Sequence, residues 1–201
     1  MRNQPAPVKR NRPGRSVTSY QRASLKTYLD DLAAKRPTPG GGSAAALTGA
    51  LGCALLSMAC NFTIGKDKYK DVESKIKSAL RETESLRKRL LSLVDLDVRA
   101  YNKVFNSRKA KENIYQKNLI AATKVPLEIG ILALKGYGLC PLLRKIANRY
   151  LISDVYVGEE LLKSCFKSAE FNVIINLPQI KDKSFILRTK KTITDLKNKL
   201  R

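Results

Sequence analysis

The chain has 201 residues, enough for one domain that buries its own core without disulfide or metal cross-links. A hydrophobic content of 43% with 28% charged residues excludes collagen-like, wholly disordered and multi-span membrane proteins. The 39 Lys and Arg residues outnumber the 17 Asp and Glu residues, and the resulting net charge of +22 predicts an anionic partner or substrate.

The histidine and cysteine content limits which catalytic groups, metal sites and disulfides the chain can form. Histidine, the commonest metal ligand and a frequent general acid or base, is absent. The four cysteines, Cys53, Cys60, Cys140 and Cys165, form no Cys-x-x-Cys pair. We therefore expect free buried thiols, a reducing cytoplasmic compartment and no metal site, with disulfide bonding as the alternative.

Both ends of the chain are basic. Residues 1–22 hold six basic residues, three prolines and no acidic residue, which predicts a disordered basic tail before a single domain over 23–201. A mitochondrial presequence is also rich in arginine, but the prolines would interrupt its amphipathic helix. Residues 181–201 hold eight basic residues against two acidic ones, so the two termini are where a polyanion or nucleic acid would bind.

The first ordered segments are expected to be two helices. From Ser24 to Ala34, apolar residues recur at i, i+3, i+4, i+7 and i+8, which predicts an amphipathic helix. Residues 43–60 are a run of small and apolar residues of helical length, which predicts a buried helix. A membrane span is the alternative, although the Ala, Gly and Ser content gives weak hydropathy and both flanks are basic.

The rest of the chain also has helical periodicity. Residues 71–106 keep it over about ten turns, which predicts one long core-spanning helix. Pro126 suits the first turn of a new helix, while Gly136 and Gly138 are expected to break the pattern. The other expected helices cover 114–124, 126–135, 141–147, 154–177 and 185–200.

One segment favours a strand by its residue types. Val173, Ile174 and Ile175 have high β-propensity, but no second segment offers a strand to pair with them. We therefore predict an all-α fold, a single helical bundle with one long central helix.

A glycine-rich turn opens the buried helix. Gly40, Gly41 and Gly42 precede Ser43, so several backbone amides at a helix N-terminus could bind an anion. The Gly-Lys-Ser/Thr that closes a nucleotide-binding phosphate loop is missing, which excludes that motif. A plain turn that leads into a helix of small residues is the alternative.

Two carboxylates lie close together on the long helix. Asp95 and Asp97 are two residues apart, so their side chains point about 200° apart and cannot form a carboxylate pair within one chain. Asp97 shares the apolar stripe of Leu90 and Val104 and is expected to face the core, with Asp95 on the polar face. In a chain without histidine, Asp97 is the leading general acid or base. A buried aspartate paired with Lys or Arg is the alternative.

Two further sets of polar residues lie at the start of the helix predicted over 154–177 and near its end. Asn148, Ser153 and Asp154 precede it or begin it, and Ser153 or Asp154 could serve only as a cap. Asn172 and Asn176 are four residues apart and share a helix face, where their side-chain amides could form hydrogen bonds with the donors and acceptors of a heterocycle. They could equally bond between helices.

Five motifs occur together in the order and spacing of one family. They are Pro39-Gly-Gly-Gly-Ser-Ala-Ala-Ala46, Val94-Asp-Leu-Asp97 with Tyr101-Asn102, Val125-Pro-Leu-Glu-Ile129, Asn148 followed by Ser153-Asp154, and Phe171-Asn-Val-Ile-Ile-Asn-Leu177. Over roughly 25–196 the chain resembles the cyclodeaminase/cyclohydrolase family. This family includes the cyclodeaminase domain of formiminotransferase-cyclodeaminase and stand-alone methenyltetrahydrofolate cyclohydrolases.

The resemblance implies an all-helical homodimer that binds folate near the subunit contact and needs no metal or nucleotide cofactor. The implied reaction closes 5-formiminotetrahydrofolate to 5,10-methenyltetrahydrofolate with release of ammonia, or hydrolyses methenyltetrahydrofolate. Asp97, and after it Asp154, would move the proton, and the amides of Gly40–Ser43 with basic residues would hold the glutamate tail. The other candidate substrate-binding residues are Asp95, Asn148, Ser153, Asn172 and Asn176.

A binding protein is the contrasting hypothesis. An inactive member of the family could use its positive charge to hold RNA or another polyanion, with no membrane partner in either case. The aromatic content is only 6% and no nucleic-acid recognition motif is visible, which favours the enzyme.

Overall fold

The structure is a computed structural model that describes residues 19–200. Most of the predicted tail over 1–22 therefore lies outside the described residues. The described part forms six α-helices and contains no strand, which confirms the all-α prediction. The helices are α1 (Leu25–Ala33), α2 (Gly41–Asn61), α3 (Glu73–Asn106), α4 (Glu112–Ile146), α5 (Ile152–Asn176) and α6 (Lys183–Asn198).

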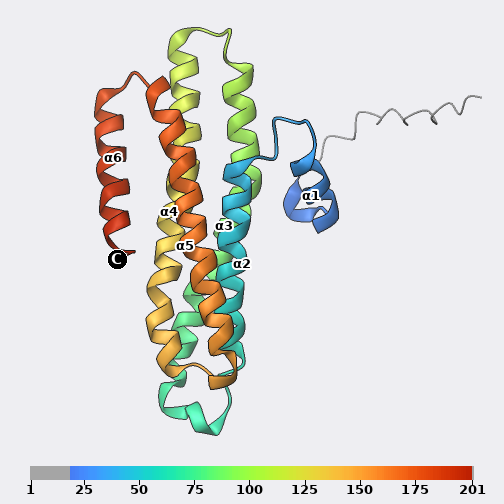
Figure 1. Cartoon of the computed structure of the whole chain (residues 1–201), viewed down its shortest axis with the longest axis vertical. Coiled ribbons are helices and arrows are strands. Elements are labelled where there is room, and N and C mark those ends of the chain that lie inside the picture. Colours follow the sequence, from blue (N-terminus) through green and yellow to red (C-terminus); the bar gives the residue numbers. More distant parts are fainter. Residues whose placement is uncertain (1–18, 201) are drawn as a thin grey trace, which may run out of the picture.

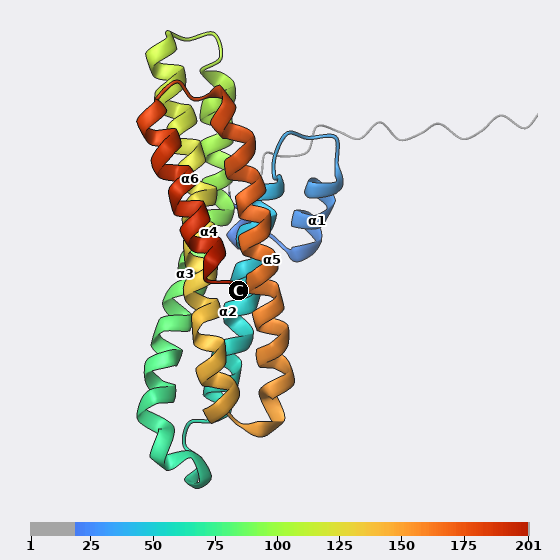
Figure 2. The same ribbon diagram turned by 60° about the vertical axis from the view of Figure 1, so that its left-hand side comes forward.

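Four of these helices make the bundle. Successive helices from α2 to α5 run in opposite directions, with α2 and α4 each packed against both α3 and α5 (Figure 1). Helix α1 stands beside the bundle at the start of α2 (Figure 1). Helix α6 turns back and covers α4 and α5 (Figure 2).

The bundle contains two long helices, where the sequence predicted a single one. Helix α4 has 35 residues, one more than α3, and both Pro126 and Pro141 lie inside it. The prediction of separate helices over 114–124, 126–135 and 141–147 was therefore wrong. An internal proline costs about 3 kcal/mol, and we attribute its tolerance here to the burial of α4 between two neighbouring helices.

Two of the three glycines of α4 are contact points, and neither Gly136 nor Gly138 breaks the helix, contrary to the prediction. A Cβ at Gly136 would lie 3.2 Å from Leu162 of α5, and one at Gly130 would lie 3.3 Å from the Phe166 ring. Both glycines therefore allow α4 and α5 to approach closely, which a sequence pattern cannot distinguish from a helix end.

Helix α2 is the apolar core helix that its composition predicts. A Cβ at Gly49 would lie 2.7 Å from the sulfur of Cys165, and one at Gly52 would lie 2.9 Å from the carbonyl oxygen of Gly158. Within the described residues α2 is also the one helix long and apolar enough to cross a membrane, but most of that stretch is buried inside the bundle.

The predicted free thiols are present. All four cysteines are buried and none is paired with another. Burial raises the pKa of Cys53, Cys140 and Cys165 to about 12 and that of Cys60 to about 11. The thiols are therefore protonated and unreactive at neutral pH.

Candidate active site

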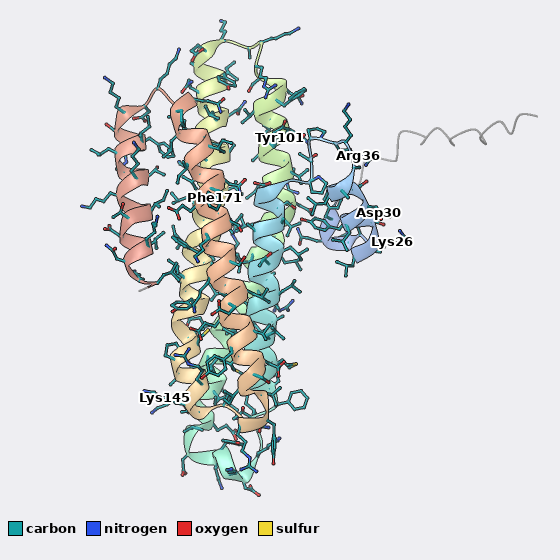
Figure 3. All side chains as sticks on the ribbon, viewed as in Figure 1. Lys26, Asp30, Arg36, Tyr101, Lys145 and Phe171 are labelled. Atoms are coloured by element: carbon teal, nitrogen blue, oxygen red, sulfur yellow. The ribbon has the colours of Figure 1, made fainter. Side chains whose placement is uncertain are left out.

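A cavity of about 340 Å³ lies where the start of α2 meets α3, α4 and the end of α5. Tyr101 of α3, labelled in Figure 3, is one of the residues that line it. Six residues that the sequence singled out line the cavity, namely Gly40, Gly41, Gly42, Asp97, Asn172 and Asn176. Residues from three separate helices and a turn therefore converge on one space.

Asp97 is the acidic residue of this cavity. Burial raises the pKa of its carboxyl from 3.8 to about 6, and a hydrogen bond from the Ser43 backbone N–H partly opposes that effect. Within residues 19–200, no cation pairs with Asp97, so the predicted alternative of a buried ion pair is not what the structure has. A carboxyl that titrates near neutrality can both take and give a proton at physiological pH.

Gly42 provides the space that Asp97 occupies. A Cβ at residue 42 would lie 2.1 Å from Oδ1 of Asp97 and 2.6 Å from its Cγ. No side chain fits there, because real Cβ atoms do not approach other atoms so closely. The carboxylate therefore rests against the first turn of α2, where the helix dipole and the free amides stabilise negative charge.

The glycine-rich turn presents backbone to the cavity, as predicted. Gly40 precedes α2 as its N-cap residue, and its carbonyl oxygen accepts the first helical bond from Ala44 at 3.0 Å. The Ser43 side chain is buried behind the turn, and its Oγ lies 3.1 Å from the hydroxyl of Tyr28. Only the backbone N–H of Ser43 faces the carboxylate.

The two asparagines lie on the opposite wall, as their spacing predicts. The Nδ2 of Asn172 donates to the Ser168 carbonyl oxygen at 2.8 Å, which fixes the amide. Its Oδ1 then faces the glycine turn, 3.3 Å from where a Cβ of Gly41 would lie. Asn176 lines the cavity one helical turn further along α5.

Asp95 lies outside the cavity and is buried, where the sequence predicted a polar face. It is 4% exposed and accepts hydrogen bonds from Ser19 Oγ at 2.5 Å, from the Tyr20 backbone N–H at 2.7 Å and from Gln21 Nε2 at 3.1 Å. Residues 19–22 therefore pack on α3, and the ordered part of the domain includes them, not only residues from 23 on. Helical periodicity could not show this, because the covering segment lies far away in the sequence.

Asn148, Ser153 and Asp154 also lie outside this cavity, at the connection from α4 to α5. Asn148 is buried, donates through Nδ2 to the Phe62 carbonyl oxygen at 3.1 Å, and accepts from the Tyr150 backbone N–H at 3.2 Å. Ser153 and Asp154 belong to the first turn of α5, which begins after Leu151. At 1.5 Å per residue, Asp154 is about 27 Å along α5 from Asn172, so it does not reach the cavity of its own chain.

Among the residues that the structure describes, no group of three His, Cys, Asp or Glu side chains is placed to hold a metal ion. The cavity contains a carboxyl, backbone amides and carboxamides, which are groups able to form hydrogen bonds with an organic substrate.

Comparison with known proteins connects this geometry to a family. A family model described as formiminotransferase-cyclodeaminase matches residues 24–195. The chain is 36% identical over 172 residues to a methenyltetrahydrofolate cyclohydrolase of Methylorubrum extorquens, with 81% of this chain and 83% of the relative aligned. The chain belongs to the formiminotransferase-cyclodeaminase family.

Two further members show how the chain relates to longer and to solved proteins. It is 30% identical to the formimidoyltransferase-cyclodeaminase of Rattus norvegicus, with 87% of this chain aligned to 34% of that enzyme. The chain thus spans about one third of that relative. The crystal structure of formiminotetrahydrofolate cyclodeaminase from Thermotoga maritima matches with a TM-score of 0.86 and 31% identity, over 89% of this chain and 90% of that chain.

The family membership confirms the resemblance drawn from the five motifs, and it gives no support to the alternative of an RNA- or polyanion-binding protein. All the relatives named above are enzymes by their names, and two of those names specify a tetrahydrofolate. Four of the five motifs contribute to the cavity lining. The glycine turn and the last motif, on α5, supply three residues each, the α3 motif supplies Asp97 and Tyr101, and the third motif supplies Pro126.

Five polar or aromatic residues of the cavity were not assigned to the site from the sequence: Thr38, Tyr101, Arg108, Tyr115 and Gln179. A signal for two of them was present. Asp97, Tyr101 and Arg108 follow one another at spacings of four and seven residues, so they share one face of α3 and its end. The Arg108 guanidinium lines the cavity and lies 4.9 Å from the centre of the Phe105 ring.

Proposed function

We propose that this protein is a folate one-carbon enzyme that cyclises 5-formiminotetrahydrofolate to 5,10-methenyltetrahydrofolate and releases ammonia. The observation that carries the proposal is Asp97, whose pKa burial raises to about 6 in a cavity bordered by free helix amides. The close match to a solved cyclodeaminase over nearly the whole of both chains supports it. No bound cofactor is proposed, because the tetrahydrofolate derivative is the substrate.

The reaction needs one proton to move between two nitrogens. N10 attacks the carbon of the protonated formimino group, and the Asp97 carboxylate takes the proton that N10 loses. The carboxyl then returns this proton to the leaving nitrogen as the carbon–nitrogen bond to ammonia breaks. Asp97 ends in its starting state, and a group with a pKa close to physiological pH performs both steps efficiently.

The remaining cavity residues suit the other parts of a folate. The carboxamides of Asn172 and Asn176 can donate to and accept from the pterin ring, which carries both kinds of group. Arg108 is the one cationic residue among the described residues that line the cavity, and it would bind a carboxylate of the glutamate tail. The amides of Gly40–Gly42 are a second donor set for that negative charge.

Hydrolysis of methenyltetrahydrofolate is the second candidate. It is favoured by the 36% identity to a cyclohydrolase that aligns over most of its own length. In this reaction water attacks the same one-carbon centre, and the Asp97 carboxylate takes a proton from the water. The carbon–N5 bond then breaks as N5 gains that proton from Asp97, and the hydroxyl loses its own proton to solvent, which leaves a formyl group on N10. Both reactions use the same carboxyl and the same electrophilic carbon.

Assays with both substrates test the proposal. For the cyclodeaminase we expect purified protein with 5-formiminotetrahydrofolate to yield methenyltetrahydrofolate and ammonia in equal amounts, followed by ultraviolet absorbance and ammonia determination. For the cyclohydrolase we expect faster loss of methenyl absorbance than in buffer alone. If neither substrate is turned over above the Asp97→Asn background, the proposed function is wrong.

We also propose that the protein is a homodimer that associates through one face of α2 and α5. Residues 41–65 contain no charged residue in a chain where 28% of residues are charged. On α2 and α5, which lie side by side in Figure 1, exposed apolar side chains follow helical spacing along this face. They include Leu51 and Phe62 on one helix and Val157, Phe171 and Ile175 on the other.

Charge supports a second copy as the occupant of this face. Two copies with a net charge of +22 repel each other, and an uncharged apolar face is where that repulsion is smallest and the burial is most favourable. Ile175 continues the face into the wall of the cavity. A second copy seated antiparallel would bring its own start of α5, which carries Asp154, towards this cavity.

We also propose that the protein is located in the cytoplasm. Four buried free thiols support a reducing compartment, since extracellular chains usually pair their cysteines.

A further inference from the structure

Tyr28 is a buried tyrosine behind the cavity that the proposed reaction does not use. It is the only residue of α1 that is buried, with 4% of its surface exposed. Figure 3 shows α1, marked by Lys26 and Asp30, standing beside the bundle at the start of α2. A single tyrosine therefore provides the buried contact of this helix, and its hydroxyl enters the protein interior.

The hydroxyl of Tyr28 has one hydrogen-bond partner among the described residues. It lies 3.1 Å from Oγ of Ser43, which is itself fully buried. A buried hydroxyl pair of this kind is costly to separate, because each oxygen would lose its only partner. The pair therefore ties α1 to the first turn of α2.

Ser43 has a polar neighbour on two sides. Its hydroxyl faces Tyr28, while its backbone N–H lowers the pKa of the Asp97 carboxyl, which lies against the first turn of α2. The preceding residue cannot shift towards α3, since Asp97 already fills the space next to Gly42. The first turn of α2 is thus held between a tyrosine on one side and the carboxylate on the other.

Tyr28 is itself held in place. Its ring meets the Tyr20 ring edge to face, with 5.4 Å between the ring centres. The Tyr20 backbone N–H donates to Asp95, two residues before Asp97 on α3. Tyr28 is therefore connected, through Tyr20 and Asp95, to the helix that carries Asp97.

Tyr28 also stays neutral. Burial, and to a lesser extent the nearby negative charge of Asp97, raises the pKa of its phenol above the usual 10, against the Ser43 hydrogen bond. The groups that face Tyr28 are Ser43, Tyr20 and Asp97, and none of them is a cation. The tyrosine can orient the turn at any physiological pH without exchanging a proton.

We propose that Tyr28 is a positioning residue that, through Ser43, holds the first turn of α2 against Asp97 and so sets the proton affinity of that carboxyl. The effect on catalysis rests on the proposed function, whereas the effect on Asp97 itself does not. Tyr28 touches no reacting atom in this scheme.

The test is Tyr28→Phe, which removes only the hydroxyl. The Asp97 carboxyl is followed by its ¹³C resonance during a pH titration, assigned by its absence in Asp97→Asn. Since the Ser43 N–H lowers the pKa of Asp97, we expect loosening of the turn to raise that pKa by about half a unit. We also expect kcat to fall several-fold with less than a two-fold change in KM.

Tyr20→Phe is the matched control. It makes the same chemical change on the neighbouring ring, where the hydroxyl donates to Asp31 at 3.1 Å and not to Ser43. We expect it to leave the Asp97 resonance unchanged. Ser43→Ala is the second variant, for the case that Tyr28→Phe does not fold, and it should shift the resonance in the same direction.

The outcomes separate this inference from the proposed function. An unchanged Asp97 titration in Tyr28→Phe, or in Ser43→Ala if only that variant folds, overturns the inference. An equal shift in Tyr20→Phe also overturns it, because the effect would then belong to the whole docked helix. If the wild-type chain turns over neither folate, the proposed function fails while the titration still tests Tyr28.

Discussion

Gly42 and Asp97 share one small space: the carboxylate oxygen of Asp97 lies 2.1 Å from where a Cβ of residue 42 would be. The two residues come from different helices, so this contact aligns the start of α2 with the middle of α3. It also explains why a glycine is needed at this point of the turn.

Replacing Gly42 with alanine should therefore damage the site and the fold together. The new methyl group must displace the carboxylate or part the two helices, and overpacking of this kind costs about 1–3 kcal/mol. We expect turnover to fall at least as steeply as stability, measured by thermal unfolding and by steady-state kinetics. Gly138→Ala is the control, since a Cβ there has no neighbour within 4 Å and should be neutral or slightly stabilising. Unchanged activity in Gly42→Ala would contradict the site geometry.

Asp97→Asn should reduce turnover by roughly 10²–10⁴-fold, because the amide cannot exchange a proton. The same substitution should increase the free energy of unfolding at neutral pH. The folded-state pKa of about 6 lies above the unfolded value of 3.8, so the folded protein keeps a proton that the unfolded chain releases. The stability of the wild-type protein should therefore fall as pH rises from about 4 to about 6, by on the order of 1–3 kcal/mol.

The neutral variant should lack that dependence. Unfolding free energies measured by denaturant titration at pH 4.5 and pH 7 give the comparison, with Asp95→Asn as a matched change two residues away. Asp97→Asn should be the more stable protein at pH 7 and the less active one. Parallel pH curves for wild type and Asp97→Asn would show that the carboxyl is not perturbed by burial.

The two truncations at residues 18 and 22 should differ sharply. Removal of residues 1–18 keeps the three hydrogen-bond donors of Asp95, whereas removal of 1–22 takes all of them away. A buried carboxylate without partners costs about 3–5 kcal/mol. We expect the longer truncation to lower the melting temperature markedly and the shorter one to have little effect. Asp95→Asn in the longer truncation should recover part of the loss, and equal melting temperatures would refute this role of Asp95.

Arg108→Ala should raise KM for the folate substrate by roughly tenfold and leave kcat nearly unchanged. A hydrogen bond between charged partners is worth about 1.5–3 kcal/mol, and Arg108 lines the cavity from just beyond the end of α3, while Asp97 lies within that helix. Lys109→Ala removes a neighbouring charge that does not line the cavity and serves as the control. Equal KM increases in both variants would indicate general electrostatic attraction and no specific contact.

Leu51→Glu should convert a dimer into monomers. Its side chain is 52% exposed in the middle of the uncharged α2 face, where a carboxylate would be buried in the proposed contact. Sedimentation velocity measures the outcome, with Leu187→Glu on the exposed side of α6 as the control. A monomeric wild-type chain would show that the proposed dimer does not form. A dimeric Leu51→Glu variant would show that the subunits associate through another surface.

The amino-acid sequence by itself determined the all-α class, the family and the core of the site. Helical periodicity identified α1, α3, α5 and α6, because each has apolar residues repeated every three or four positions, but it divided α4 into three pieces. The same periodicity placed Asp95 and Asp97 on different sides of α3. The glycine turn and the asparagine pair were visible because short motifs of that composition have few structural roles.

Only the tertiary structure decided which residues meet. Gly136 is a close contact between α4 and α5 where the sequence suggested a break, and Asp95 is covered by residues 19–21 where it suggested a polar face. Asp154 belongs to another of the five family motifs than Asp97. It lies in the first turn of α5, at the end of that helix away from the cavity. Such contacts join positions far apart in the chain, and local periodicity carries no information about them, since they depend on how whole helices pack.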